Sequence, residues 1–146
     1  MSIFHLAIPS HNLALSKEFY TKCFEANVGR EYDQYIIFNF FGHQVVTHLK
    51  PDEIPKDVKM YPRHYGIILE TRGNFDKIYS LCKQEKAPFF VDLFERYQNE
   101  KGWHFSFFVS DPSNNLIELK YYVDKIESNA NSDNGLPTID LYAVSF

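Results

Sequence analysis

The sequence predicts an α+β fold in which the order strand, helix and three strands occurs twice along 146 residues. Three observations support this. Residues 2–9 and 64–70 each alternate between two sets of side chains, as strands do. Each segment is followed by a run with apolar residues every three or four positions, which indicates a helix. Short alternating runs separated by turn-forming residues then follow in both halves.

The first half supplies one complete set of elements. After the strand at residues 2–9, Pro9 marks a break and Asn12 is a candidate helix cap. A helix is expected at residues 12–24, where apolar side chains recur every four residues. Three strands are then expected at residues 27–32, 35–41 and 43–50, and Gly42 joins the last two as a hairpin.

The second half repeats this order after a connector with three prolines. Its first strand is expected at residues 64–70, and Asn74 can cap a helix that stops at Ala87 and Pro88. Strands are expected at residues 89–93, 103–110 and 116–123. The predicted domain spans residues 1–123, with module one at 1–50, the connector at 51–63 and module two at 64–123, and a linker and tail follow at 124–146.

The composition favours a folded domain that binds a small molecule. Hydrophobic residues make up 45% of the chain and aromatic residues 17%, which allows a large core. The formal charge is -4 and Lys and Arg are scattered, which argues against nucleic-acid binding. The sequence shows neither a membrane span nor a secretory signal, so a cytoplasmic protein is expected. Cys23 and Cys82 are expected to be buried thiols rather than a disulfide.

Four side chains that can bind a metal lie in matching elements of the two halves. His5 and His64 open the first strand of each half, 59 residues apart, while His48 and Glu118 lie in the last strand of each half. Equivalent positions of duplicated modules are expected to face one another. Two imidazoles and one carboxylate leave open coordination positions, which suits Fe(II), Mn(II) or another first-row ion. The alternative for Glu118 is an ion pair with Lys120 or Arg63.

Strand parity indicates which face of the sheet carries the site. In residues 103–110 the odd positions are apolar and should meet the helices, so His104 and Phe108 fall on the opposite face. Glu118 falls on this same face, where a buried carboxylate requires a partner or a metal. The predicted pocket is lined by Ile37, Asn39, Phe41, His104 and Phe108. The alternative for Asn39 and His104 is that they only satisfy neighbouring backbone groups.

Four segments resemble the vicinal-oxygen-chelate superfamily, which includes glyoxalase I, type I extradiol dioxygenases, fosfomycin-modifying enzymes and bleomycin-binding proteins. They are FHLAIPSHNLALSKEFYTKCF, FNFFGHQVVTHLKP, RHYGIILE and SDPSNNLIELKYY, and the resemblance covers about residues 2–123. The second and third segments are most similar to small proteins described as extradiol-dioxygenase-like. The resemblance implies two βαβββ modules that form an open cup-shaped sheet, with metal ligands at His5, His64 and Glu118.

Two residues depart from the patterns of these enzymes. Bacterial glyoxalase I has a glutamate, both ligand and base, at the position of His48, so His48 weakens that assignment. Many type I extradiol enzymes have a tyrosine at the position of Phe108, and its hydrogen bond cannot be made here. These enzymes also have an acid-base histidine near the position of His48. The resemblance thus implies that His48 is a fourth ligand or an acid-base group.

The resemblance leaves three functions open. An extradiol-type dioxygenase would use Fe(II), bind a small substrate through two adjacent oxygens, and use His48 or His104 to move protons. A glyoxalase-like lyase or isomerase would use the metal to stabilise an enediolate, and Mn, Zn, Ni or Co are alternatives to iron. The third function is metal-free binding of a small molecule, of the resistance type. A small-molecule substrate and a homodimer are the expected partners.

Overall fold

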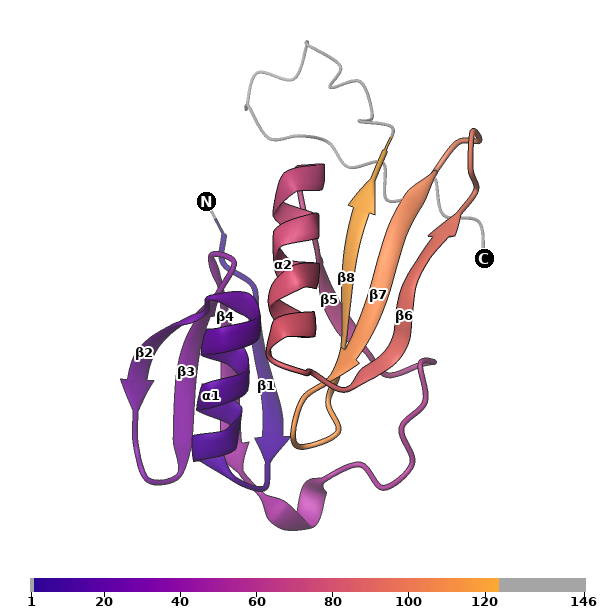
Figure 1. Cartoon of the computed structure of the whole chain (residues 1–146). Helices are drawn as coiled ribbons and strands as arrows, with labels where there is room; N and C mark the ends of the chain where they lie inside the picture. Colours follow the sequence, from indigo (N-terminus) through magenta and orange to yellow (C-terminus); the bar gives the residue numbers. More distant parts are fainter. Residues whose placement is uncertain (1, 124–146) are drawn as a thin grey trace.

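The computed structural model describes residues 2–123, which form two sheets and two long helices (Figure 1). The first module contains β1 (His5–Ser10), α1 (Leu13–Phe24), β2 (Asn27–Glu31), β3 (Tyr35–Phe40) and β4 (His43–Leu49). The second contains β5 (Tyr65–Ile68), α2 (Arg72–Gln84), β6 (Phe89–Arg96), β7 (His104–Ser110) and β8 (Leu116–Tyr122). The α+β fold and its two βαβββ modules are therefore confirmed. The predicted linker and tail at 124–146 lie outside the described residues.

Each module forms its own four-stranded sheet with the same strand order. The orders are β1-β4-β3-β2 and β5-β8-β7-β6, and neither sheet closes into a barrel. The first strand of each module is parallel to its neighbour, whereas the other pairs are antiparallel. Within residues 2–123, β1 and β5 are therefore edge strands that pair on one side only, as are β2 and β6 at the opposite edges of the two sheets.

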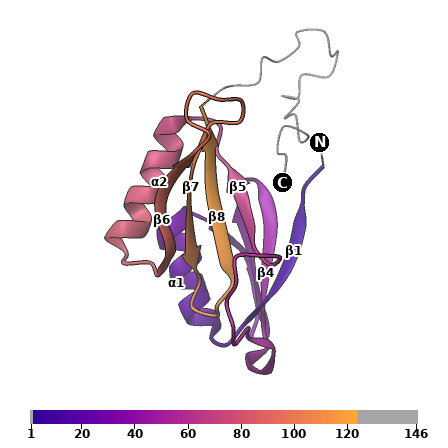
Figure 2. The same ribbon diagram turned by 90° about the vertical axis from the view of Figure 1, so that its right-hand side faces the viewer.

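Both helices lie on the same side of the strands (Figure 2), and α1 packs against α2. The two modules thus meet in part through their helices, whereas the expected meeting of His5 with His64 and Glu118 does not occur within residues 2–123. The reason is that each helix buries apolar side chains both against its own sheet and against the other helix. Neither helix is long and apolar enough to cross a membrane, and the same holds for every helix within residues 2–123.

The core lies between the helices and the sheets and is rich in aromatic rings. Ile36, Phe38 and Phe40 of β3 are buried there, as their alternation predicted. Phe40 contacts Phe24 of α1 edge to face, with ring centroids 5.3 Å apart. Burial of each large apolar side chain stabilises the fold by roughly 1.5–3 kcal/mol. Cys23 and Cys82 are buried free thiols, in agreement with the prediction.

Several element boundaries differ from the prediction, and three of the differences have a clear physical reason. β1 continues through Pro9, which is compatible with proline because an edge strand can spare one backbone donor. α2 begins after Thr71, because the Thr71 hydroxyl accepts a hydrogen bond from the amide of Asn74 at 3.1 Å. β6 extends to Arg96 rather than ending at residue 93. Register shifts within β6 interrupt its alternation and concealed this longer strand.

A buried polar junction joins the two modules. The Tyr20 hydroxyl of α1 donates to Asp111 Oδ2 at 2.9 Å and is 2.5 Å from the Tyr65 hydroxyl of β5. In the β7–β8 turn, Asn115 Nδ2 donates to the Pro9 carbonyl at 2.9 Å. Because Tyr20 and Asp111 are almost fully buried, these hydrogen bonds are shielded from water. The junction fixes the turn and the start of β5 against the first module.

Candidate metal centre

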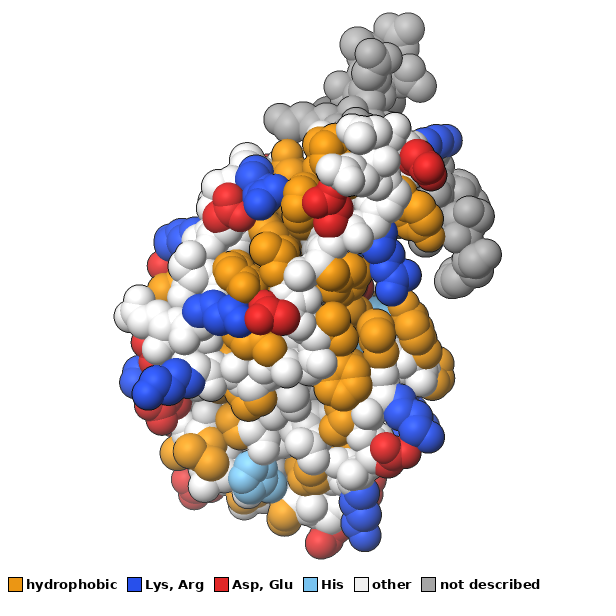
Figure 3. Space-filling model, turned by 45° about the vertical axis from the view of Figure 1, so that its right-hand side comes forward, with side chains coloured by type: hydrophobic (Ala, Val, Ile, Leu, Met, Phe, Trp, Pro, Cys, Tyr) orange, Lys and Arg blue, Asp and Glu red, His pale blue; other side chains and the backbone are white. Residues whose placement is uncertain are grey.

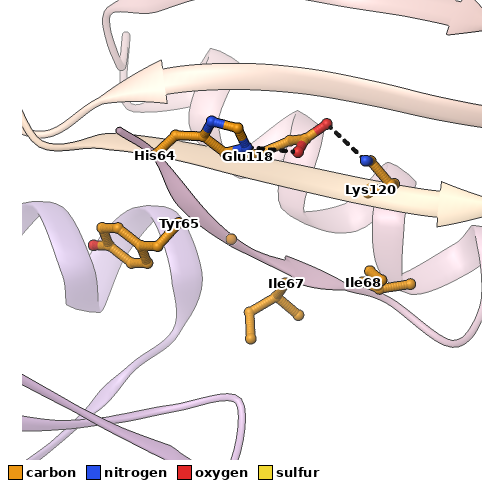
Figure 4. Close-up of a pocket in the computed structure, with 7 residues that line it drawn as sticks. His64, Tyr65, Ile67, Ile68, Glu118 and Lys120 are labelled. Carbon is orange, nitrogen blue, oxygen red and sulfur yellow. Dashed lines mark ion pairs between the residues drawn. The ribbon is translucent and has the colours of Figure 1, made fainter. Parts of the chain in front are cut away.

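The face of β5–β8 turned away from α2, here called the open face, carries polar side chains from adjacent strands. Strand register places directly paired residues on the same face. Gly66 and Phe108 both pair with Glu118, and His64 precedes Gly66 by two positions, which gives it the same parity. The further members by register are Ile68, Phe94, Arg96, His104, Ser106, Lys120 and Tyr122. In Figure 4, Tyr65 and Ile67 point away from His64 and Glu118.

His64 and Glu118 form the centre of this face. His64 Nε2 lies 3.3 Å from Glu118 Oε2 (Figure 4). His64 Nδ1 lies 2.7 Å from the Met60 carbonyl oxygen, which can only accept, so Nδ1 carries a hydrogen. In neutral His64 the Nε2 lone pair then faces a carboxylate oxygen. Two acceptors in this position are stabilised by a cation between them, and metal-binding histidines commonly donate their other N–H in this way.

The second carboxylate oxygen of Glu118 is held by two donors. Ser106 Oγ donates to Oε1 at 2.6 Å, and Lys120 Nζ lies 3.2 Å from the same oxygen. The ion pair with Lys120 that the sequence left as an alternative is thus present. It occupies Oε1 only, so Oε2 remains directed at His64 Nε2. Sequence reasoning did not single out Ser106, although its parity with His104 and Phe108 was the available signal.

His5 does not join this pair. It lies exposed in β1, at the edge of the first sheet, and its Nδ1 lies 2.5 Å from Gln44 Oε1. Because that amide oxygen accepts, the hydrogen is on Nδ1 and Nε2 has the free lone pair, as in His64. Within residues 2–123 no three His, Cys, Asp or Glu side chains form a group that could hold a metal. The structure brings together His64 and Glu118 and places His5 on the other sheet.

The expected equivalence of His48 and Glu118 is wrong. Ala7 and Gly66 each lie two residues after the histidine that opens their module. Ala7 pairs with Val46 in β4, just as Gly66 pairs with Glu118 in β8. Val46 is therefore the counterpart of Glu118. The prediction paired His48 with Glu118 because each lies in the last strand of its module. Strand register, however, determines which positions of the two modules correspond.

His48 corresponds instead to Lys120, since it lies two residues after Val46 as Lys120 lies two residues after Glu118. Its ring packs against Tyr35 of β3, with centroids 5.4 Å apart. On the first sheet it shares a face with His5, but it is four positions along β4 from the residue that pairs with His5. That spacing separates the two histidines by roughly 13 Å along the strand.

The predicted pocket residues are divided between the two sheets. Ile37 and Asn39 lie on the face of the first sheet that carries His5. Asn39 Oδ1 accepts a hydrogen bond from the Gly42 amide at 2.8 Å, so it closes the β3–β4 turn. Phe41 lies in this turn at a φ of 52°, and its ring contacts core rings instead of extending the strand. His104 and Phe108 lie on the second sheet.

Phe108 of β7 pairs directly with Glu118, whereas His104 lies four positions away on the same face of β7 and pairs with Tyr122. His104 is 7% exposed, and its Nδ1 lies 2.8 Å from the Gly102 carbonyl oxygen, which leaves the Nε2 lone pair free. Burial lowers the pKa of His104, so the imidazole is neutral near pH 7. The Phe108 ring contacts the His64 ring edge to face, at a centroid distance of 5.2 Å. This contact restricts the rotation of the imidazole.

Two hollows adjoin His64. One, of about 290 Å³, is lined by Glu118 and Lys120 together with β5. The other, of about 520 Å³, lies between β1, the connector and the β7–β8 turn, and its wall includes Leu6 and Arg63. Both volumes suit small molecules rather than polymers. On the surface in Figure 3, positive and negative side chains are interspersed between apolar ones, without the broad basic area that nucleic-acid binding requires.

Comparison with known proteins agrees with this architecture. The family model of the Glyoxalase/Bleomycin resistance protein/Dioxygenase superfamily matches residues 2–119. A crystal structure of a glyoxalase/bleomycin resistance protein/dioxygenase from Alicyclobacillus acidocaldarius is 43% identical, with a TM-score of 0.79, and the match covers 84% of this chain and 92% of that one. No match was found among curated proteins.

More distant structures share the fold alone. The fosfomycin resistance protein FosX from Listeria monocytogenes is 16% identical with a TM-score of 0.65, over 83% of this chain and 93% of that one. Lactoylglutathione lyase from Agrobacterium tumefaciens is 14% identical with a TM-score of 0.62, over 82% of this chain and 92% of that one. Taken with the family match and the repeated βαβββ modules, the chain belongs to the glyoxalase/bleomycin resistance protein/dioxygenase superfamily.

Proposed function

We propose that the chain is a divalent-metal enzyme acting on a small molecule with two adjacent oxygens, and that His64, Glu118 and His5 hold the metal. The observation that carries this proposal is the pair of acceptors, His64 Nε2 and Glu118 Oε2, held 3.3 Å apart. The donor types fit Fe(II), Mn(II) and other first-row ions. Members of the superfamily commonly use divalent metals, which supports the same conclusion.

The third ligand, His5, comes from a second copy of the chain. His5 is exposed at an unpaired sheet edge, and His64 opens the strand at the equivalent unpaired edge of the other module. When β1 of one copy lies beside β5 of another, equivalent positions of the two modules meet and His5 approaches His64. Its Nε2 lone pair is already free for a metal. A symmetric dimer would contain two such sites.

Complementation between two inactive variants tests both the ligands and their division between copies. His5→Ala and Glu118→Ala should each bind no stoichiometric Mn(II) alone. In a mixed dimer, His5 of the Glu118→Ala copy and Glu118 of the His5→Ala copy together make one intact site. Mixing should therefore restore about one metal per mixed dimer, while dimers of a single variant remain empty. Metal binding by either variant alone at the unaltered stoichiometry would contradict the proposal.

When bound, the metal would supply a positive centre that polarises oxygen atoms of the substrate. The protein groups around it have separate tasks. Ser106 and Lys120 hold Oε1 of Glu118, which orients Oε2, and Phe108 fixes the plane of the His64 ring. His104, neutral and with Nε2 free, can accept a proton from a substrate on the open face.

We infer that the reaction is of the extradiol-dioxygenase type. The first module has Val46 at the position that corresponds to Glu118, so it supplies no second carboxylate ligand there. The proposed ligand set is therefore limited to two histidines and one carboxylate. Such a set leaves several coordination positions for substrate oxygens and O2, as in non-haem Fe(II) oxygenases. The test is oxygen consumption with catechols after anaerobic loading with Fe(II). Cleavage that depends on Fe(II) and on Glu118 is expected.

A second candidate is a glyoxalase-like lyase or isomerase, and the neutral imidazole of His104 favours it. A proton-transfer reaction requires a base near the metal but no redox-active ion. Activity with Ni(II) or Zn(II) but not with Fe(II) and O2 would select this candidate. His104→Gln should then lower kcat more than the affinity for Mn(II). A purified protein that binds small molecules but no metal would instead favour a sequestering protein.

A further inference from the structure

The open face of the second sheet has an excess of positive charge. The charged residues of β5–β8 whose register places them there are Arg96, Glu118 and Lys120. The acids of β6 face the other way. Glu95 accepts a hydrogen bond from the Trp103 indole at 2.9 Å, and Asp92 Oδ2 lies 2.6 Å from Lys83 Nζ of α2. Neither acid can neutralise the open face.

Within residues 2–123, protein groups do not occupy all N–H donors of these two cations, Arg96 and Lys120. In the part of the chain that the structure describes, Arg96 makes no ion pair and lies over the Phe94 ring, with its guanidinium carbon 5.2 Å from the centroid. Within residues 2–123, Lys120 Nζ pairs with Oε1 of Glu118, which Ser106 also holds, and lies 5.9 Å from the centroid of the Tyr122 ring. A divalent metal on Glu118 would add further positive charge. An external anion near both cations would then be stabilised by their positive charge.

Arg96 and Lys120 act on the same part of this face. His104 pairs directly with Arg96 across β6 and β7, and Lys120 pairs with the next same-face residue of β7, Ser106. After burial and the hydrogen bond to Gly102, the charge of Lys120 lowers the pKa of His104, the charge of Glu118 raises it, and the charge of Arg96 lowers it. The two cations therefore flank the proposed proton acceptor. Because Lys120 also pairs with Glu118, a substrate held by Lys120 would adjoin the His64–Glu118 pair.

We propose that Lys120 and Arg96 bind an anionic group of the substrate, a carboxylate, phosphonate or phosphate, on the open face. The proposal deepens the proposed function and rests on it for the position of the reacting end of the substrate. It favours substrates, catechols included, that carry an acidic group over those that do not, because the acidic group would pair with Arg96, which forms no ion pair within residues 2–123. Arginine and lysine together provide several N–H donors for the oxygens of such a group.

Binding of small anions to the metal-free protein tests this. Methylphosphonate and acetate serve as probes, acetamide is the uncharged control, and calorimetry measures affinity. Lys120→Met and Arg96→Met should each weaken anion binding about tenfold or more, since one charge-assisted hydrogen bond is lost. Lys120→Arg should retain most of the affinity. Lys22→Met, which removes an exposed lysine of α1 paired with Glu18, should leave it unchanged.

The outcomes separate this inference from the proposed function. Tighter binding of methylphosphonate or of acetate identifies the class of anion, and either supports the proposal. Equal binding of acetamide, or unchanged anion affinity in folded Lys120→Met and Arg96→Met proteins, overturns it. Mn(II) binding is measured separately by electron paramagnetic resonance. A protein that binds Mn(II) but no anion contradicts the inference alone, whereas one that binds the anion but no Mn(II) contradicts the metal centre alone.

Discussion

Gly66 of β5 lies directly against the backbone of Glu118 in β8, and a β-carbon at position 66 would overlap the Glu118 carbonyl oxygen. Position 66 therefore requires glycine, because the backbones of the two strands approach too closely for a side chain. His64 lies two residues before Gly66, and the carboxylate of Glu118 faces the His64 imidazole. The close contact of the two strands thus sets the separation of the two proposed ligands.

Gly66→Ala should weaken both the fold and the metal site. The new methyl group would overlap the backbone of Glu118, which cannot rotate away as a side chain could. β5 must therefore move away from β8, at a cost of about 1–3 kcal/mol. The same movement increases the distance from His64 to Glu118. We expect a lower free energy of unfolding in urea and weaker Mn(II) binding in the same variant.

Gly73→Ala is the matched control. Gly73 lies in the first turn of α2, and an added β-carbon there meets no atom within 4 Å. Alanine favours a helix over glycine, so this change should be neutral or stabilise the protein by up to about 1 kcal/mol. Equal effects of the two substitutions would show that the close approach at Gly66 does not matter.

Glu118→Gln should abolish tight metal binding while leaving a folded protein. Glutamine keeps the shape of the side chain and can still accept from Ser106, but it lacks the negative charge that a divalent cation requires. Metal content after dialysis measures the loss, and circular dichroism checks the fold. Glu31→Gln, which alters an exposed ion pair with Lys17, should retain the metal. Unchanged metal content in Glu118→Gln would remove this residue from the ligand set.

The junction between the modules should depend more on Tyr20 than on Tyr65. Tyr20→Phe leaves Asp111 Oδ2 without one of its donors and Tyr65 without its partner, a loss of about 1–3 kcal/mol. Tyr65→Phe removes only one hydrogen bond, about 0.5–1.5 kcal/mol. Chemical unfolding of both single variants and the double variant measures their coupling. Additive losses would mean that the two hydroxyls act independently.

Asp111 should make stability depend on pH. Burial raises the pKa of this carboxyl above its usual range, against the opposing effect of its hydrogen bonds. A group with a raised pKa in the folded state adds stability at low pH and loses it as the pH rises through that value. The stability of the unaltered protein relative to Asp111→Asn should thus fall as the pH rises from about 4, the ordinary pKa of an aspartate, through the raised pKa, by at most about 1.4 kcal/mol per pH unit. A constant difference across this range would contradict the prediction.

The sequence by itself determined the repeated βαβββ order, the core alternation in β3 and the face of β7 and β8 that carries polar side chains. These features follow from local periodicity, which is set by backbone geometry within one element. Asn12 was likewise recognisable as the cap of α1, because capping depends on neighbours three residues apart. Local rules failed in β6, where register shifts disturb the alternation, and at α2, where Thr71 caps the helix instead of Asn74.

Only the tertiary structure decided which ligands meet. His64 and Glu118 lie on strands that are adjacent within one sheet, so their proximity follows from β5–β8 pairing. His5 lies on a separate sheet because β1 pairs with β4, so its position relative to His64 depends on how the two modules pack. The mismatch of His48 has the same origin, since strand register is a long-range property that no local pattern encodes. His64 and Glu118 are 54 positions apart in sequence and lie together because the backbones of β5 and β8 are hydrogen-bonded. No local sequence pattern predicts which strands pair in this way.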